Sequence, residues 1–422
     1  MPGLILAAPS SGCGKTTITL GLLRALKQRG VNVHGAKSGP DCIDPRFHEA
    51  ASGAPCLNLD AWAMSPARIR ALAATDALLL IEGAMGLFDG APPDGRGATA
   101  DLARILGLPV VLIVDAERMA QSVAPLVQGF ARHDPDISIA GLILNRVGSE
   151  RHELILRKSL TNIGIPVLGV VHRQTGLAHP SRHLGLVQAQ ERPDLEAFLN
   201  IVAAAVGNQI DLNALVAIAA ALPSAAATKP MPPPAQRIAL AQDAAFAFAY
   251  PHLLRDWRDL GAEILPFSPL NNQPAPAADM IFLPGGYPEL YAGQISSNTI
   301  FLNSLKNARQ DTVIHGECGG YMVLGEGLTD ADGTRHSMAG LLPLETSFAE
   351  RRLHLGYRRL RPLGGPFNMA LNAHEFHYAT TLRAEGPALY EASDAEGSVL
   401  PPMGLRAGHV SGSFAHVIDR AV

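Results

Sequence analysis

A short glycine-rich segment near the start of the chain has the residue types and spacing of a phosphate-binding loop. Residues 9–17 read Pro-Ser-Ser-Gly-Cys-Gly-Lys-Thr-Thr and follow an apolar run at 4–8. Small residues in such a turn allow successive backbone N–H groups to converge on phosphate oxygens at a helix N-terminus. Lys15 would reach the β and γ phosphates of ATP, and the Thr16 hydroxyl would bind Mg²⁺. The residues predicted to hold the nucleotide in this segment are Gly12, Gly14, Lys15, Thr16 and Thr17.

One position of this segment departs from the usual loop pattern. Pro9 stands in place of the first glycine, five residues before Gly14, although Gly12 and Gly14 remain where the turn is tightest. The alternative interpretation is a glycine-rich turn between a strand and a helix that binds no ligand.

A second polar segment follows the strand expected at 31–37. Residues 37–48 read Lys-Ser-Gly-Pro-Asp-Cys-Ile-Asp-Pro-Arg-Phe-His, and α/β sheets bind ligands just past their strand ends. Lys37 could neutralise a phosphate or a carboxylate. We assign Asp41 to the metal and Asp44 to the substrate, while the same spacing also suits a turn or a helix cap.

Two further strand ends carry candidate ligands. An apolar strand at 77–81 ends at Glu82, where a phosphate-loop enzyme needs an acidic residue to hold Mg²⁺ opposite the loop threonine. Thr16, Glu82 and Asp41 are therefore the predicted metal ligands. A later strand at 141–144 ends at Asn145. Its amide could read the adenine edge of the nucleotide, with a buried structural asparagine as the alternative.

A cysteine between glycines forms a second chemical centre late in the chain. Gly316, Gly319 and Gly320 surround Cys318, between a strand expected at 312–315 and a helix. This arrangement permits a sharp nucleophile elbow, with the thiol exposed above the sheet and its thiolate favoured by the helix N-terminus. An inert, buried apolar cysteine is the alternative.

A thiolate nucleophile needs a base, and His416 near the C-terminus is the best-placed candidate. The backbone N–H groups of Gly285 and Gly286 could form the oxyanion hole. A carboxylate two residues after the histidine would complete a triad, but that position is Ile418, and Asp419 is one residue away. The third member is therefore left open.

Composition and length limit the classes of protein that fit. The 422 residues exceed what one hydrophobic core usually supports, which favours two domains. With 34 basic and 38 acidic residues, the formal net charge of −4 argues against a general nucleic-acid or membrane-surface binder. The four cysteines form no C-x-x-C pair, so neither zinc nor disulfides are indicated. We expect a cytoplasmic protein without a leader or membrane helix.

The order of the expected elements gives the fold class and the domains. Strands alternate with helices through the first half, which predicts a mostly parallel, doubly wound sheet. An alanine-rich helical stretch is expected at 211–222. A Pro/Ala-rich spacer follows, with four prolines between positions 230 and 234. The predicted organisation is a ligase domain at 1–222, a linker at 223–236 and a second α/β domain at 237–422.

Four segments of the first half resemble the synthetase domain of the cobyrinic and hydrogenobyrinic acid a,c-diamide synthases. That domain is related in fold to dethiobiotin synthetase and to partitioning ATPases, and the likeness covers at least residues 3–200. It implies an ATP-dependent amide ligase, in which a substrate carboxylate attacks the γ-phosphate and ammonia attacks the resulting acyl phosphate. The segments are residues 9–17, 38–45, 82–90 and 144–146.

The second half, at about 237–420, resembles a class I glutamine amidotransferase domain. The resemblance implies that Cys318 attacks glutamine to give a glutamyl thioester and ammonia. Many relatives carry a glutamate at the position of Ile418, but the diamide-synthase branch commonly lacks it, so this departure agrees with the family.

An arginine-rich stretch precedes a histidine motif in this half. Five arginines lie within residues 351–361, and 374–378 reads His-Glu-Phe-His-Tyr. Arginine's planar fork suits a substrate with many carboxylates, so Arg351 and Arg358 are predicted to contact the substrate. A solvated edge strand is the alternative. The sequence assigns no separate role to each residue of the histidine motif.

The chain is thus predicted to amidate the a and c carboxylates of a corrin precursor in cobalamin biosynthesis, with glutamine and MgATP. Another tetrapyrrole, such as nickel sirohydrochlorin, is the first alternative, and a partitioning-type regulatory ATPase is the second. Partners are small molecules, the corrinoid polycarboxylate and glutamine, with no nucleic acid and no membrane; a homodimer is left open.

Overall fold

The computed structural model describes residues 2–174, 181–182, 185–186, 188–225 and 228–421. The chain divides into two compact units, Met1–Thr228 and Lys229–Val422. Among the described residues, no helix is both long and apolar enough to span a bilayer.

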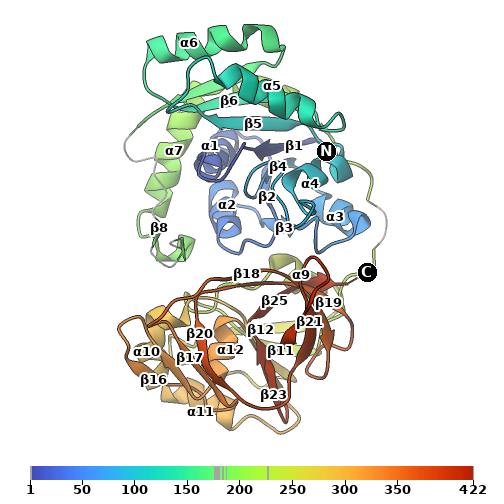
Figure 1. Ribbon diagram of the computed structural model, residues 1–422. Helices are drawn as coiled ribbons and strands as arrows, with labels where there is room; N and C mark the ends of the chain where they lie inside the picture. Colours follow the sequence, from blue (N-terminus) through green and yellow to red (C-terminus); the bar gives the residue numbers. More distant parts are fainter. Residues whose placement is uncertain (1, 175–180, 183–184, 187, 226–227, 422) are drawn as a thin grey trace. The chain divides into compact units, whose positions relative to one another are not determined.

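The first unit is built on a parallel sheet (Figure 1), as the alternation of strands and helices predicted. Leu4, Ile5 and Leu6 are fully buried, because helices cover both faces of the sheet and strands in such sheets are apolar throughout. In spatial order the strands are β3 (Leu57–Leu59), β2 (Val33–Ser38), β4 (Leu78–Glu82), β1 (Pro2–Ala7), β5 (Val110–Asp115), β6 (Ile139–Val147) and β7 (Val167–His172).

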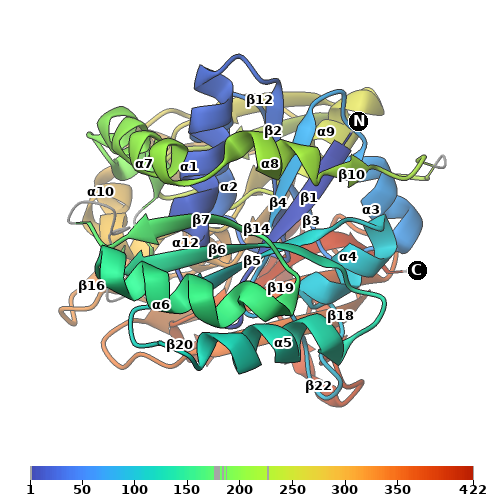
Figure 2. The same ribbon diagram turned by 90° about the horizontal axis from the view of Figure 1, so that it is seen from above.

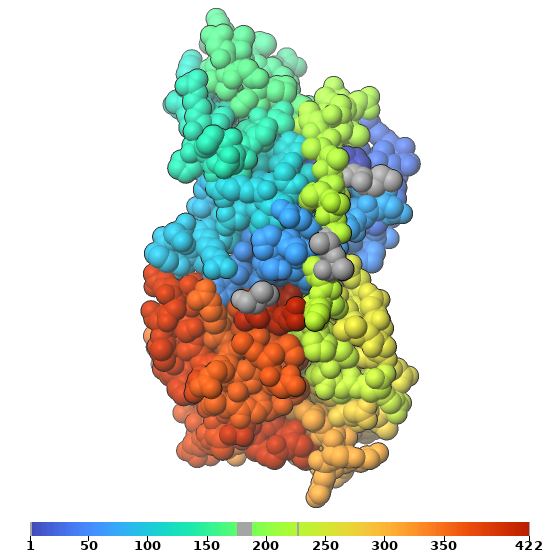
Figure 3. Space-filling view, turned by 90° about the vertical axis from the view of Figure 1, so that its right-hand side faces the viewer, coloured from blue at the N-terminus to red at the C-terminus, as the bar shows by residue number. Residues whose placement is uncertain are grey.

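Figure 2 shows α1, α7 and α8 on one face of this sheet, and α5 and α6 on the other. Gly21 allows α1 to approach α7 closely, because a Cβ there would lie 2.5 Å from the Val206 side chain. Figure 3 shows the yellow-green α7 at the surface. The helices are α1 (Lys15–Gln28), α2 (Asp44–Ser52), α3 (Pro66–Ala73), α4 (Thr99–Leu106), α5 (Val123–His133), α6 (Glu150–Leu160), α7 (Leu195–Gln209) and α8 (Leu212–Ala217). β8 (Ser181–Arg182) pairs antiparallel with β9 (Gly185–Leu186).

The helix expected at 211–222 is shorter than predicted. It ends at Ala217, and Ala220–Ala221 form β10, which pairs antiparallel with Pro2 and Gly3 of β1. The start of β1 offers backbone hydrogen bonds that a further helical turn could not use, and helix propensity is a weak preference that tertiary pairing overrides.

The second unit contains a parallel sheet with one antiparallel edge strand, as expected for its α/β class. Helices α9 (Pro251–Asp259), α10 (Ala292–Ser297), α11 (Thr299–Lys306) and α12 (Gly319–Leu324) belong to this unit. The strand order is β12 (Glu263–Phe267), β11 (Arg237–Ala241), β13 (Met280–Leu283), β14 (Val313–Glu317), β24 (Val410–Ser413) and β23 (Leu405–Ala407).

Two smaller sheets complete the second unit. One has the order β22 (Val399–Met403), β21 (Tyr390–Ser393), β18 (His354–Pro362), β19 (Leu371–His377) and β25 (Ala415–Arg420). The other has the order β16 (Arg335–Ser337), β15 (Gly327–Thr329), β17 (Leu344–Ser347) and β20 (Thr380–Ala384).

Candidate active sites

The turn between β1 and α1 has the backbone that a phosphate loop requires. Gly12 and Gly14 have φ values of 81° and 86°, in the left-handed region that favours glycine. A Cβ at Gly14 would also lie 2.3 Å from the Asn145 side-chain nitrogen. That nitrogen donates to the Cys13 carbonyl at 2.8 Å, so Asn145 holds the loop itself. This is the structural alternative to the predicted reading of adenine.

Lys15 and Thr16 begin α1 and point to different partners, and Thr17 follows them in the first turn. The Lys15 amino group donates to the Ser10 carbonyl at 3.2 Å and to the Met85 carbonyl at 2.5 Å. Burial lowers the pKa of Lys15, so this cation carries a desolvation cost that an anionic ligand would offset. The Thr16 hydroxyl instead donates to the Glu82 carboxylate at 2.6 Å.

Glu82 lies at the centre of a buried cluster. Its Oε1 accepts from Thr16 and from the Lys37 amino group, the latter at 2.9 Å, and its Oε2 lies 2.6 Å from His48 Nε2. Burial opposes ionisation, but Lys37 and His48 hold the pKa of Glu82 below its ordinary value. His48 is fully buried, and its Nδ1 faces the Cys56 thiol at 3.5 Å. His48 is the last residue of the polar segment 37–48, but no role could be predicted for it from the sequence.

The two aspartates of the 37–48 segment lie elsewhere than we predicted: Asp44, which we assigned to the substrate, lies beside Thr16 and Lys37, whereas Asp41, which we assigned to the metal, belongs to a turn. Asp44 lies in the cluster, 2.6 Å from the Lys37 amino group and 3.4 Å from the Thr16 hydroxyl. Asp41 accepts the backbone N–H groups of Ile43 and Asp44 at 2.7 and 3.1 Å. These bonds form the turn that leads into α2.

The cluster suits Mg²⁺, which prefers oxygen ligands from one or two carboxylates. Thr16, Asp44 and Glu82 offer such oxygens, and Asp44 Oδ1 is buried without a hydrogen-bond partner among the described residues. Lys37 would remain beside the carboxylates as a second cation.

Glu82→Gln should reduce the rate of amidation, with either glutamine or ammonia, by a factor of roughly 10² or more. The variant loses the negative charge to which both Thr16 and Lys37 donate hydrogen bonds. Steady-state rates with each nitrogen source would measure this. Glu49→Gln, which weakens the part-buried Arg46–Glu49 pair in α2, is the matched control and should stay within about twofold. Equal losses in both variants would count against a special role for Glu82.

Cys318 occupies the sharp turn that its glycines predicted. It lies between β14 and α12 with a φ of 45°, a strained value for a residue with a side chain. The expectation of an exposed thiol with a favoured thiolate is wrong. Cys318 is only 3% exposed, and burial, together with the nearby Glu289 carboxyl, raises the pKa of its thiol.

The Gly285–Gly286 turn connects the cysteine with the predicted base. A Cβ at Gly285 would lie 2.1 Å from Cε1 of His416, and a Cβ at Gly319, next to Cys318, would lie 3.1 Å from the Gly286 nitrogen. The residues predicted for nucleophile, base and oxyanion hole are therefore brought together. Burial lowers the pKa of His416 to about 3, so its imidazole is neutral at pH 7, the form a base requires, but burial also makes it a weaker base than an ordinary histidine.

No carboxylate orients His416 in the described part of the chain. Its Nδ1 is buried without a hydrogen-bond partner. The Ile418 carbonyl accepts a hydrogen bond from His252 Nε2 at 2.7 Å, and Asp419 Oδ1 accepts the Arg420 N–H at 2.8 Å. Among the residues that the structure describes, Cys318 and His416 therefore have no carboxylate as the third member of a triad.

Two buried glutamates beside Cys318 were missed from the sequence. Glu317 precedes the cysteine and accepts the Val417 N–H at 3.3 Å, and Glu289 follows the Gly285–Gly286 turn. Burial raises the pKa of each to about 8. Their position next to the predicted site residues is the only signal that could have indicated them.

The arginine-rich stretch is not an edge strand, because β18 pairs with β19 on one side and with β21 on the other. Arg351 precedes the strand and is exposed. The Arg358 side chain is largely buried and forms an ion pair with Glu375 at 2.7 Å. The substrate contact predicted for Arg358 therefore lacks support, because its guanidinium already binds a carboxylate of the same sheet.

Gly285→Ala should reduce glutaminase activity by roughly 10²-fold or more, because the new methyl group would displace the His416 ring. Ammonia-dependent synthesis should stay near its normal rate, and both can be followed by product assays. In Gly293→Ala the added Cβ meets only an ordinary contact of 3.5 Å with His336, so this control should keep both activities. Normal glutaminase activity in Gly285→Ala would contradict the placement of His416.

Comparison with known proteins gives two family matches that divide the chain. Residues 4–187 match the CobQ/CobB/MinD/ParA nucleotide binding domain, and residues 237–421 match the CobB/CobQ-like glutamine amidotransferase domain. Over its full length the chain is 54% identical to hydrogenobyrinate a,c-diamide synthase of a Sinorhizobium species, covering 99% of that protein. The enzymes of the same name from Brucella suis biovar 1 and Rhodobacter capsulatus are 54% and 51% identical over 99% of this chain, with 99% and 98% of their own lengths covered.

Proposed function

The chain belongs to the family of the hydrogenobyrinate a,c-diamide synthases, and on this premise we propose that it amidates the a and c carboxylates of a corrin precursor, hydrogenobyrinic or cobyrinic acid, with glutamine as nitrogen donor and ATP as energy source. The full-length identity to enzymes of this name carries the proposal. A nucleotide-binding unit and a glutamine amidotransferase unit in one chain are what such a glutamine-dependent ligase requires.

The second unit supplies ammonia. The Cys318 sulfur attacks the amide carbon of glutamine, His416 takes the thiol proton and passes it to the departing ammonia, and a glutamyl thioester remains. Water then hydrolyses the thioester to glutamate and regenerates the thiol. The N–H groups of the Gly285–Gly286 turn would hold the oxyanion that forms at each step.

The first unit uses this ammonia. A substrate carboxylate oxygen attacks the γ-phosphorus of ATP, giving an acyl phosphate and ADP, and ammonia displaces phosphate to form the amide. The loop N–H groups and Lys15 bind the phosphates, and Lys37 neutralises charge beside them. Thr16, Asp44 and Glu82 would hold Mg²⁺, which neutralises the charge that develops on the transferring phosphoryl group.

The alternatives from the sequence receive less support. A partitioning-type ATPase would not require the amidotransferase unit, and the relatives reported above carry the hydrogenobyrinate name rather than that of another tetrapyrrole. Arg351 is exposed before β18 and remains our proposed contact for a substrate carboxylate. A homodimer and a cytoplasmic location stay predictions of the sequence.

The function can be tested with Cys318→Ser. The purified protein should convert hydrogenobyrinic acid to its a,c-diamide with glutamine and MgATP, as measured by mass spectrometry. Cys318→Ser should lose the glutamine-dependent reaction and keep the reaction with high concentrations of ammonia, since only the nucleophile is removed. Loss of both reactions in a folded variant would place the cysteine in the ligase chemistry. No diamide from the unaltered protein would refute the proposed function.

Lys15→Ala tests the ligase unit separately. Amidation should fall by roughly 10² or more with either nitrogen source, because the charge on the phosphoryl group is no longer stabilised. Glutaminase activity should persist. Lys27→Ala, at the other end of α1, is the control. Near-normal synthesis in folded Lys15→Ala would show that the loop does not bind phosphate as proposed.

A further inference from the structure

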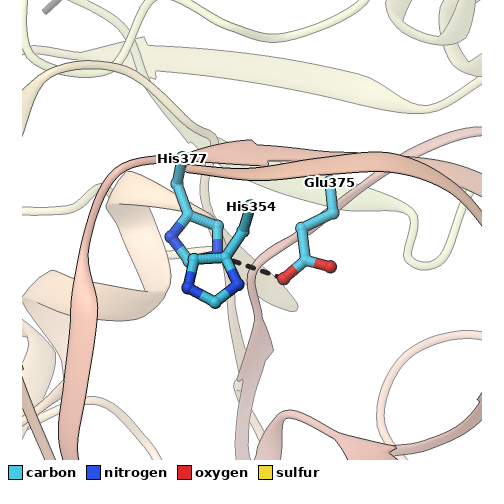
Figure 4. A group of neighbouring side chains, drawn as sticks. All are labelled: His354, Glu375 and His377. Carbon is cyan, nitrogen blue, oxygen red and sulfur yellow. Dashed lines mark hydrogen bonds and ion pairs between the residues drawn. The ribbon is translucent and has the colours of Figure 1, made fainter. Parts of the chain in front are cut away.

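An ion pair in the amidotransferase unit lies close to the nucleophile and has no part in the mechanism above. Both Nε and Nη2 of Arg358 donate to Oε2 of Glu375, at 2.8 and 2.7 Å, and Oε1 of Glu375 lies 3.0 Å from His377 Nε2. All three side chains are at least 87% buried. Figure 4 shows Glu375 and His377 joined by this contact, with the His354 ring over that of His377.

The surroundings fix this group in one arrangement. The His377 ring lies between the rings of His354 and Phe414, with centroid distances of 4.6 and 3.9 Å. Gly356 lies opposite Glu375 in the β18–β19 pair, and a Cβ there would come within 2.8 Å of Arg358 Nη1. A larger residue at position 356 would displace the guanidinium from Glu375.

The peptide between the two anchored residues of β19 faces the nucleophile. Glu375 and His377 point to one face of the strand, since side chains alternate along it, and Phe376 lies between them. The Phe376 carbonyl oxygen is 3.9 Å from Cys318 Sγ. Anchoring residues 375 and 377 therefore holds a hydrogen-bond acceptor beside the thiol.

The pair also governs the charge near the thiol. Three carboxyl groups lie close enough to raise the pKa of Cys318, those of Glu289, Glu375 and Glu317. Burial keeps Glu289 and Glu317 largely protonated at neutral pH, whereas His377 and Arg358 hold the pKa of Glu375 below its ordinary value against the effect of burial. Glu375 is thus the ionised carboxylate of the three, and Arg358 is the cation that neutralises it.

We infer that Arg358 and Glu375 are positioning residues of the glutaminase site: with His377 they hold the Phe376 carbonyl beside Cys318, and Arg358 cancels the carboxylate charge that would otherwise oppose formation of the thiolate. This rests on the proposed function only in that Cys318 is the glutaminase nucleophile.

His354, Glu375 and His377 could also be considered as metal ligands, since one donor atom from each lies within 4.8 Å of the others. The geometry disfavours this. The two imidazole planes are nearly parallel, at 7°, and a metal at about 2.1 Å from each nitrogen cannot lie in both planes. Arg358 already places a cation on the carboxylate that the metal would need.

The inference can be tested by alkylating Cys318 with iodoacetamide at pH 7.5 and locating the adduct by mass spectrometry. Arg358→Met leaves Glu375 uncompensated, so alkylation and glutaminase activity should both fall about tenfold or more. Glu375→Gln should raise the alkylation rate, because the charge is removed, yet lower kcat/KM for glutamine, because Phe376 is held less firmly. The double variant should recover the alkylation rate that Arg358→Met loses.

Arg361→Met is the matched control, because Arg361 lies on the same strand and pairs with Glu391 at the surface. It should leave alkylation and glutaminase within about twofold of the unaltered protein. Ammonia-dependent amidation should change little in every variant. If Arg358→Met does not fold, the alkylation rates of Arg358→Lys and Glu375→Gln are compared instead. A lysine keeps the positive charge and should retain most of the alkylation rate, whereas Glu375→Gln should raise it.

Three results would overturn the inference. One is an unchanged alkylation rate in Arg358→Met and in Glu375→Gln. Another is a parallel fall of alkylation, glutaminase and ammonia-dependent activity in both variants, which would indicate a merely structural role. The third is a stoichiometric transition metal, found by elemental analysis, whose removal by chelator abolishes glutaminase. Alkylation and glutaminase need no corrinoid, so these failures are distinguishable from a failure of the proposed substrate.

Discussion

The buried carboxylate of Glu82 is the charge around which the nucleotide-binding unit is organised. An ionised group inside a protein is tolerated only when it is paired and hydrogen-bonded, and Glu82 has three such partners in Thr16, Lys37 and His48. The parallel register supplies one of these partners directly, because Glu82 pairs with Lys37 of β2, and it also pairs Glu82 with Leu6 of β1, the strand that leads into the phosphate loop. The sheet thus places the phosphate loop, the lysine and the acidic residue in one row at its carboxyl edge.

The amidotransferase unit handles buried charge in the opposite way. Cys318 lies among three carboxyl groups, and two of them, Glu289 and Glu317, have pKa values raised to about 8 by burial. Protonation of these two carboxyl groups therefore limits the negative charge around Cys318. In the nucleotide-binding unit, by contrast, Glu82 stays ionised and Lys37 compensates its charge. Glu375, by contrast, forms an ion pair with Arg358. The same physical requirement, that few uncompensated charges remain buried, is met by different chemistry in the two halves.

Much of this could be predicted from the sequence because the decisive signals are local. Glycines with positive φ mark the loop at Gly12 and Gly14, and apolar runs mark the strands that end at the sites. What could not be predicted depends on partners far along the chain. Arg358 was assigned to substrate because Glu375, seventeen residues away, could not be identified as its partner. Asp41 and Asp44 have equivalent sequence contexts, and only the turn that Asp41 closes shows which of the two reaches the cluster.

Without a triad carboxylate, other groups of the site must stabilise the protonated form of His416. With Nδ1 unpartnered among the described residues, nothing directly stabilises the imidazolium that forms when His416 takes the thiol proton. Of the charged groups that influence His416, only Glu375 raises its pKa, while His374 and His377 lower it. Glu375 therefore favours the imidazolium but opposes the thiolate at Cys318. The ion pair of Glu375 with Arg358 meets both requirements. The paired carboxylate remains ionised but exerts only a weak field at the Cys318 thiol, and the pair keeps the strand between residues 375 and 377 in place.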